Sequence, residues 1–137
     1  MRIEVLRPTC NLDTVRDGRG GIFTWVPPDP IVEFNWVHVR PGKVRGMHYH
    51  EHFVEYLLVV QGSGVLITKD DHLDPDCPEE FVHLNPGTCT RTPIKVVHTV
   101  QAVTDLVFIA MLTKKWDESH PPLVQVGTLP HLRPATV

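Results

Sequence analysis

Hydrophobic positions along the chain cluster in short β-branched runs that prolines and glycines separate. No segment sustains an apolar repeat of 3.6 residues, so long amphipathic helices are not expected. The chain has 13 prolines and 9 glycines in 137 residues, and short apolar runs between such turn signals are typical of a β-sandwich or barrel. The runs expected to form strands are 31–39, 55–60, 64–68, 79–84, 94–103 and 105–112. An all-β fold is therefore predicted.

Two segments interrupt this strand pattern. The stretch KDDHLDPDCPEE, residues 69–80, is acidic and contains proline, so we expect a surface excursion between two strands. The tail from Ser119 carries four prolines and is too irregular for a core strand. It is expected to run extended over the body or onto a second subunit. Because no internal repeat or linker is found, residues 1–137 are predicted to form a single domain.

Composition narrows the class of protein without indicating its chemistry. The net charge is −3 with scattered lysines and arginines, which argues against a nucleic-acid partner. No apolar run approaches the roughly 20 residues of a membrane span, and the start MRIEVLRPTC is too mixed for a signal peptide. Cys10, Cys77 and Cys89 are far apart and form no C-x-x-C pair, so they are expected to be reduced thiols. The prediction is a soluble cytoplasmic protein without a membrane partner.

The stretch GKVRGMHYHEHFVEYLLVVQG, residues 42–62, places several metal-ligating side chains directly before an apolar run. Residues two apart on a strand face the same side, so His48 and His50 should point together. Glu55 has the opposite parity and joins them only if the chain bends through 51–54. His98, on a later apolar strand, is the fourth candidate. Imidazole and carboxylate groups are ligands for divalent iron, manganese, nickel and zinc, so these four residues are a candidate metal site.

Other readings of the histidines remain open from the sequence. The quartet could instead line a metal-free barrel in which histidines act as acid and base. His52 is expected on the bend and outside the site. His38 has the same parity as Phe34 and Trp36. It is a candidate to line the same cavity, either behind the metal ligands or facing the substrate. Met47, Tyr49 and Tyr56 have the opposite parity from the histidines and are expected to pack outside the barrel.

The spacing of these residues resembles a known family. Gly42, five residues, His48, one residue, His50, four residues, Glu55, six residues and Gly62 reproduce the first cupin motif in full. In the second motif, Gly87, Pro93 and His98 fit the frame, whereas Lys95 replaces a glycine and Ala102 replaces an asparagine. The chain thus resembles the cupin superfamily from about residue 34 to residue 111.

This resemblance implies a fold and a site. A cupin is a small jelly roll, also described as a double-stranded β-helix barrel. The family pattern implies one divalent metal ion inside the barrel, held by His48, His50, Glu55 and His98. The sequence does not select among iron, manganese, nickel and zinc. Cupins commonly pair through their sheets, so a homodimer is implied as well.

A narrower resemblance concerns nucleotide-sugar cupins. RGMHYH, residues 45–50, is similar to a motif of the dTDP-4-dehydrorhamnose 3,5-epimerases and dTDP-4-keto-6-deoxyglucose 3,4-ketoisomerases, and so are DGRGGIF, residues 17–23, and KKWDESH, residues 114–120. Those enzymes abstract a proton next to a ketone. The resemblance implies that His48 is the base and that Arg45, with Arg19 from a neighbouring subunit, grips the pyrophosphate.

The chain also departs from these enzymes. Glu55 stands where the epimerases have a catalytic lysine and the ketoisomerases a glutamine, and the ketoisomerases lack the histidine that His98 supplies. Lys115 and Trp116 occupy the region of the epimerase's catalytic tyrosine. The first hypothesis is therefore a metal-dependent sugar or nucleotide-sugar isomerase or epimerase that acts through an enediolate. The alternatives are a non-haem iron dioxygenase of a small chelating substrate and a non-catalytic metal- or ligand-binding cupin.

Overall fold

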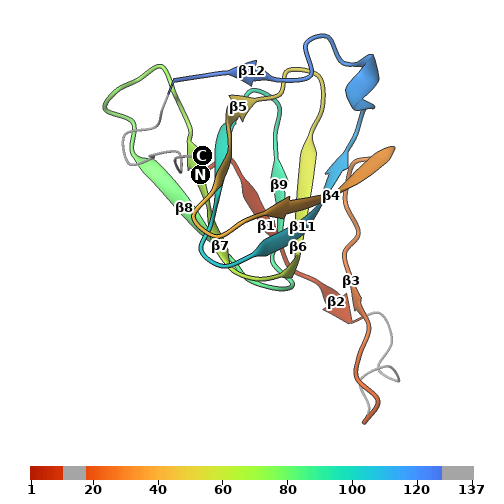
Figure 1. The fold of residues 1–137 in the computed structure, drawn as a ribbon. Coiled ribbons are helices and arrows are strands. Elements are labelled where there is room, and N and C mark those ends of the chain that lie inside the picture. The colour runs from red at the N-terminus through yellow and green to blue at the C-terminus, as the bar shows by residue number, and fades with distance from the viewer. Residues whose placement is uncertain (11–17, 128–137) are drawn as a thin grey trace.

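The computed structural model describes residues 1–10 and 18–127, which form two five-stranded sheets that face each other (Figure 1). The first sheet has the order β1 (Glu4–Leu6), β9 (Cys89–Thr92), β6 (Glu55–Gln61), β11 (Leu106–Leu112) and β4 (Glu33–Val39). The second has the order β12 (Val124–Gln125), β5 (Val44–Tyr49), β10 (Val97–Ala102), β7 (Gly64–Lys69) and β8 (Glu79–Leu84). A separate pair joins β2 (Thr9–Cys10) to β3 (Phe23–Thr24).

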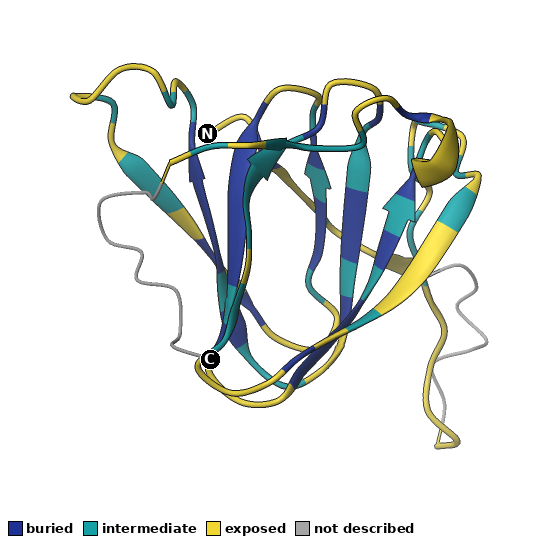
Figure 2. Cartoon of the chain, turned by 45° about the horizontal axis from the view of Figure 1, so that its top comes forward, coloured by how far each residue is buried: buried dark blue, intermediate teal, exposed yellow. Residues whose placement is uncertain are grey.

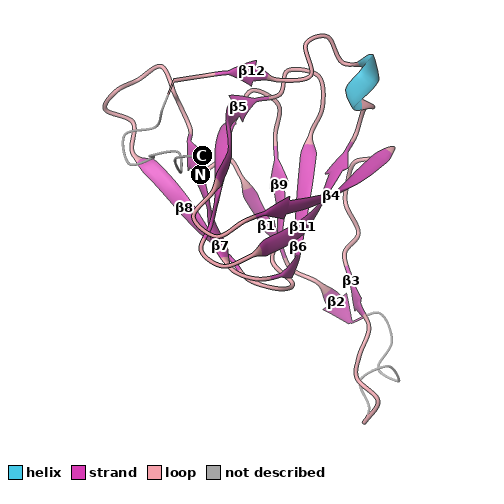
Figure 3. Cartoon of the chain, viewed as in Figure 1, coloured by secondary structure: helices cyan, strands magenta, loops and turns pink. Residues whose placement is uncertain are grey.

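The strand connections identify the fold. All the pairings are antiparallel. The chain passes repeatedly from one sheet to the other, so that most neighbours in the two five-stranded sheets are distant in sequence, whereas β7 and β8 are consecutive. Apart from the short 3₁₀ helix η2 (Trp116–Glu118), the described regular elements are strands (Figure 3). This arrangement is a jelly roll, which confirms the predicted all-β cupin fold.

The predicted strands match the observed ones closely. The run 79–84 coincides with β8, and the other runs differ from their strands by a few residues at the ends. The acidic segment forms a loop between β7 and β8, as expected. The tail contributes β12, whose Val124 pairs with Tyr49 on β5, so it runs across the body. Tail residues 128–137 and Asp17 of the DGRGGIF motif lie outside the described residues.

The core lies between the two sheets, and the buried residues are concentrated on their strands (Figure 2). Leu57 and Phe108 from the first sheet meet Leu66 and Val100 from the second in one buried cluster. Burying side chains of this kind stabilises the fold by about 1.5–3 kcal/mol each. In the part of the chain that the structure describes, no helix has the length and apolar character needed to span a membrane.

A β-bulge in β5 changes which residues face the interior. His48 pairs with His98 and Gly46 pairs with Thr99 on β10, so Met47 is an extra residue between the two pairs. Met47 has a φ of 59°, and its N–H donates to Thr99 Oγ1 at 2.9 Å. Because the extra residue shifts the alternation by one, Arg45 and His48 both face the cavity although they are three residues apart.

Candidate functional site

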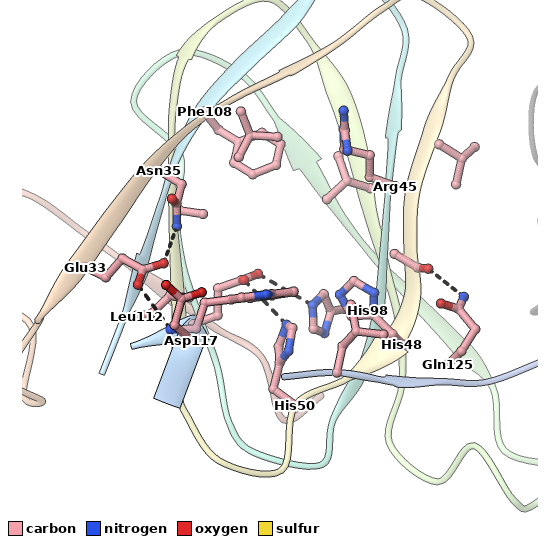
Figure 4. Close-up of a pocket in the computed structure, with 18 residues that line it drawn as sticks. Glu33, Asn35, Arg45, His48, His50, His98, Phe108, Leu112, Asp117 and Gln125 are labelled. Atoms are coloured by element: carbon pink, nitrogen blue, oxygen red, sulfur yellow. Dashed lines mark hydrogen bonds and ion pairs between the residues drawn. The ribbon is translucent and has the colours of Figure 1, made fainter. Parts of the chain in front are cut away.

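Three histidines, labelled in Figure 4, meet Glu55 inside the barrel. His48 and His50 lie at the end of β5, Glu55 opens β6 and His98 belongs to β10. One ligating nitrogen from each histidine lies within 4.8 Å of the other two. The Glu55 carboxylate is 3.5 Å from His50 Nε2 through one oxygen and 3.5 Å from His98 Nε2 through the other. The expected bend before Glu55 is present, and it brings the carboxylate beside the histidines.

The backbone fixes the orientation of two of these imidazoles. Nδ1 of His50 is 2.9 Å from the Pro122 carbonyl, and Nδ1 of His98 is 2.9 Å from the Val96 carbonyl. A carbonyl oxygen only accepts hydrogen bonds, so each Nδ1 must carry the proton and donate. Each Nε2 then points toward Glu55. Phe53 stacks on the His50 ring at a centroid distance of 4.3 Å and restricts it further.

Electrostatics of the cluster favour a positive charge at its centre. Burial, together with His98 and His50, lowers the pKa of His48 to about 3. Burial alone would raise the pKa of Glu55, but the facing imidazoles of His50 and His98 outweigh it and the pKa lies below its ordinary value. Burial lowers and Glu55 raises the pKa of His98, with a net increase. The Glu55 carboxylate thus lies among three buried imidazoles, an arrangement that a cation at its centre would stabilise.

The donor set fits a divalent metal ion. His50 Nε2 and His98 Nε2 are buried and have no hydrogen-bond partner among the described residues, although buried polar atoms are normally paired. Ligating histidines typically donate their other ring N–H to a carbonyl, as His50 and His98 do. Three imidazoles and a carboxylate suit iron, manganese, nickel or zinc. His48, His50, Glu55 and His98 are therefore the residues that could hold such an ion.

The quartet lies in an open cavity of about 900 Å³, a volume within the range of small-molecule sites. Apolar residues from both sheets form much of its wall. Arg45 is the only lysine or arginine among the described residues that line it, whereas Glu33 and Asp117 supply further carboxylates. Gln125 on β12 donates from Nε2 to the carbonyls of Gly46 and Met47 at 3.1 and 3.0 Å. The cavity wall thus combines one guanidinium group, that of Arg45, with several polar side chains.

The position expected for His38 is wrong. On β4 the side chains of Glu33, Asn35 and Val37 face the cavity, so His38 lies on the outer face. Its Nε2 is 2.8 Å from Asp105 Oδ1, and its side chain is 47% exposed. His38 does lie on the same face of β4 as Phe34 and Trp36. That face was expected to point inward because these two residues are large and apolar. They are instead 74% and 68% exposed.

The other residues that the sequence singled out lie partly in and partly outside the cavity wall. Arg45 lines the cavity because of the bulge, whereas Arg19 does not line it. His52 is exposed and outside the site, with its Nε2 3.0 Å from the His120 carbonyl. Met47, Tyr49 and Tyr56 do not line the cavity either, as the alternation predicts.

Sequence reasoning missed several residues of the cavity wall. Glu33 and Asn35 on β4, Trp116 and Asp117 on η2, and Gln125 on β12 all line it. The signal that could have identified this face of β4 is the apolar pair Val37 and Val39, which share the parity of Asn35. The positions of Asp117 and Gln125 had no comparable signal, because neither lies in a periodic segment.

Comparisons with known proteins place these features in context. The family described as "Polysaccharide biosynthesis C-terminal domain" matches residues 15–122. No curated protein matches the sequence.

Solved structures resemble the chain in fold at low sequence identity. A 3,4-ketoisomerase from Helicobacter canadensis has a TM-score of 0.75 at 14% identity, with 92% of each chain covered. A mutant of the 3,4-ketoisomerase from Thermoanaerobacterium thermosaccharolyticum, in complex with TDP-4-keto-6-deoxyglucose, has a TM-score of 0.72 at 16% identity, covering 91% of this chain and 88% of that one. The dTDP-4-dehydrorhamnose 3,5-epimerase from Sulfolobus tokodaii has a TM-score of 0.67 at 18% identity, covering 92% and 82%.

Proposed function

Because the chain belongs to the family of polysaccharide biosynthesis C-terminal domains, we propose that it isomerises or epimerises a nucleotide-linked keto sugar with the help of a divalent metal ion. The fold is that of sugar-nucleotide isomerases and epimerases. The observation that carries the proposal is the pair of buried ring nitrogens without a hydrogen-bond partner, His50 Nε2 and His98 Nε2, beside Glu55 in the wall of an open cavity.

Four residues would hold the ion, namely His48, His50, Glu55 and His98. When bound, a divalent ion polarises a ketone and lowers the cost of negative charge on its oxygen. His48 serves better as a ligand than as the base that the family resemblance implies. An imidazole whose pKa lies near 3 is neutral at pH 7 and has little affinity for a proton.

Arg45 is the residue proposed to bind the nucleotide. Its guanidinium lines the cavity and forms no hydrogen bond or ion pair with the described residues. A planar guanidinium forms paired, charge-assisted hydrogen bonds with phosphate oxygens. The proposed substrate therefore places its pyrophosphate toward β5 and its sugar toward the histidines. Replacing Arg45 with lysine would keep the charge and lose the paired geometry.

The chain is also proposed to act as a homodimer. The outer face of β4 exposes Phe34 and Trp36. Ile109 on β11 pairs with Trp36 on one side and with Leu58 on the other, so apolar residues continue across this face of the first sheet. Exposed apolar patches of this kind mark protein interfaces.

Metal dependence is tested first by elemental analysis of the purified protein. We expect about one equivalent of metal per chain, and loss of most of it in the His48→Ala/His50→Ala variant, because two of four ligands are gone. With TDP-4-keto-6-deoxyglucose as the probe, chelation should abolish turnover and added metal should restore it. Full activity of the stripped protein would overturn metal dependence.

Two further outcomes separate the alternative functions. Oxygen consumption with a catechol or enol, in the absence of ketone turnover, would favour the dioxygenase. Saturable binding of nucleotide sugars without turnover by the metal-loaded protein would favour a binding module.

A further inference from the structure

Two carboxylates outside the histidine cluster line the same cavity. Glu33 lies on β4, and Asp117 lies on η2 just after β11. Both lie on the side of the first sheet, whereas Arg45 and Gln125 lie on the side of β5 and β12 (Figure 4). A substrate held by Arg45 and the histidines would therefore have these carboxylates on its other flank.

The proposed reaction needs a side chain that removes a proton from carbon. No tyrosine, lysine or cysteine is among the described residues that line the cavity. The guanidinium of Arg45 donates hydrogen bonds and has no acceptor atom. If His48, His50, Glu55 and His98 hold the metal, the remaining proton acceptors in the described wall are Glu33 and Asp117.

The hydrogen bonds of Glu33 commit both of its oxygens. Asn35 Nδ2 donates to Oε2 at 2.9 Å, and the backbone N–H of Trp116 donates to Oε1 at 3.1 Å. The bond from Trp116 ties η2 to β4 and fixes the residue that directly precedes Asp117, and the bond from Asn35 holds the Glu33 carboxylate in place for it. Protonating Glu33 would weaken the hydrogen bonds that it accepts from Asn35 and Trp116, so Glu33 is suited to positioning Asp117 and not to accepting a proton.

The Asp117 carboxylate is available to accept a proton from the substrate. It lines the cavity and has no hydrogen bond or ion pair with any described residue. Its side chain is exposed, so a proton taken from substrate can pass on to solvent. We propose that Asp117 is the general base of this site and that Glu33 positions it. This inference rests on the function proposed above.

The step balances in protons and electrons. The C–H bond next to the ketone breaks, and its electron pair forms the carbon–carbon double bond of an enolate while the carbonyl π pair moves to oxygen. The proton forms an O–H bond on Asp117, which then releases it to water. In an epimerisation, a water molecule returns one proton to the same carbon from the opposite face as the carbonyl re-forms. The product therefore carries one hydrogen from solvent.

The experiment follows this exchange directly. The metal-loaded full chain is incubated in deuterated water with TDP- and UDP-linked 4-keto-6-deoxyglucose, and loss of the proton next to the ketone is measured by nuclear magnetic resonance. We expect Asp117→Asn to slow the exchange by at least about 100-fold, since general-base catalysis typically contributes a factor of 10²–10⁴. Metal content and the midpoint of thermal unfolding should stay at the values of the unmodified protein.

A neighbouring residue provides the matched control. Glu118 belongs to the same short helix but does not line the cavity, and its carboxylate is 3.8 Å from Lys115 Nζ at the surface. Glu118→Gln should exchange at the unmodified rate. An Asp117→Asn variant that exchanges within a few-fold of that rate would overturn the inference alone. An unmodified protein that exchanges neither substrate would overturn the proposed function as well.

Discussion

At the scale of single residues, Gly46 and Met47 decide what the site contains. The extra residue of the bulge lets Arg45 join the histidines on the inner face of β5. Gly46 has a φ of 118°, and a Cβ there would lie 2.6 Å from the His98 carbonyl oxygen. His98 is a candidate ligand, so the backbone approach that creates the bulge also sets the position of the imidazole.

Gly46→Ala should therefore disturb the site and the fold together. A side chain at this φ costs about 1–3 kcal/mol of unfolding free energy, and the added methyl group would displace the backbone of His98. The measurements are metal content and denaturant unfolding. Gly87→Ala is the control, because Gly87 has a φ of 92° but open space around it. Both variants should lose stability, and only Gly46→Ala should lose metal; equal metal content in the two would contradict this account.

At the scale of elements, the sequence predicted strands well and faces less well. The predicted strand 79–84 has the same bounds as β8. Alternating apolar residues with turns on either side define a strand from the local sequence alone. The face of β4 was misassigned, because Phe34 and Trp36 suit a core by size but lie on the outer surface. Strand length depends on neighbours in sequence, whereas the choice of face depends on what covers each side.

The candidate site divides in the same way. His48, His50 and Glu55 were predictable because their spacing on one strand and across one bend is local. Asp117 and Gln125 were not, since they enter the cavity from η2 and β12, whose placement depends on long-range pairing with β4 and β5. The bulge was hidden as well, because an extra residue is defined only by its partner strand.

The segment before β4 gives a prediction that depends on pH. Asp29 accepts from Arg91 Nε at 2.8 Å and from the Tyr56 hydroxyl, which joins residues before β4 to the outer face of β9 and β6. These hydrogen bonds, that of Arg91 first, lower the pKa of Asp29. The depressed pKa means that the carboxylate stabilises the fold above the ordinary aspartate pKa of about 3.9 and that this contribution is lost as the pH falls below it.

Asp29→Asn should lower the free energy of unfolding by about 1 kcal/mol at pH 7, since it removes a partly buried charged partner. The difference from the unmodified protein should shrink as the pH falls from 5 to 3, as measured by urea unfolding. Glu4→Gln is the control, because Glu4 contacts the same Arg91 at 3.4 Å but is 57% exposed, and such pairs contribute little. A difference for Asp29→Asn that stays constant with pH would contradict this role.

At the scale of the whole molecule, the jelly roll explains why ligands so far apart in sequence meet. The chain alternates between the two sheets, so β5 and β10 become neighbours although about 50 residues separate His48 from His98. Sheet pairing holds the cavity walls rigid on both sides. The same architecture leaves the outer face of the first sheet exposed at β4, where no described residue covers Phe34 and Trp36.

The proposed homodimer follows from that uncovered face. Two copies that pack through it would bury Phe34 and Trp36, and aromatic residues at the centre of an interface often contribute 2 kcal/mol or more. Light scattering coupled to size-exclusion chromatography should give twice the chain mass for the unmodified protein and one chain mass for Phe34→Lys/Trp36→Lys. Leu73→Lys, at an equally exposed position of the β7–β8 loop, should remain dimeric. The metal content of the Phe34→Lys/Trp36→Lys variant should be unchanged, because both side chains lie outside the cavity. A single chain mass for the unmodified protein at micromolar concentration would refute the dimer.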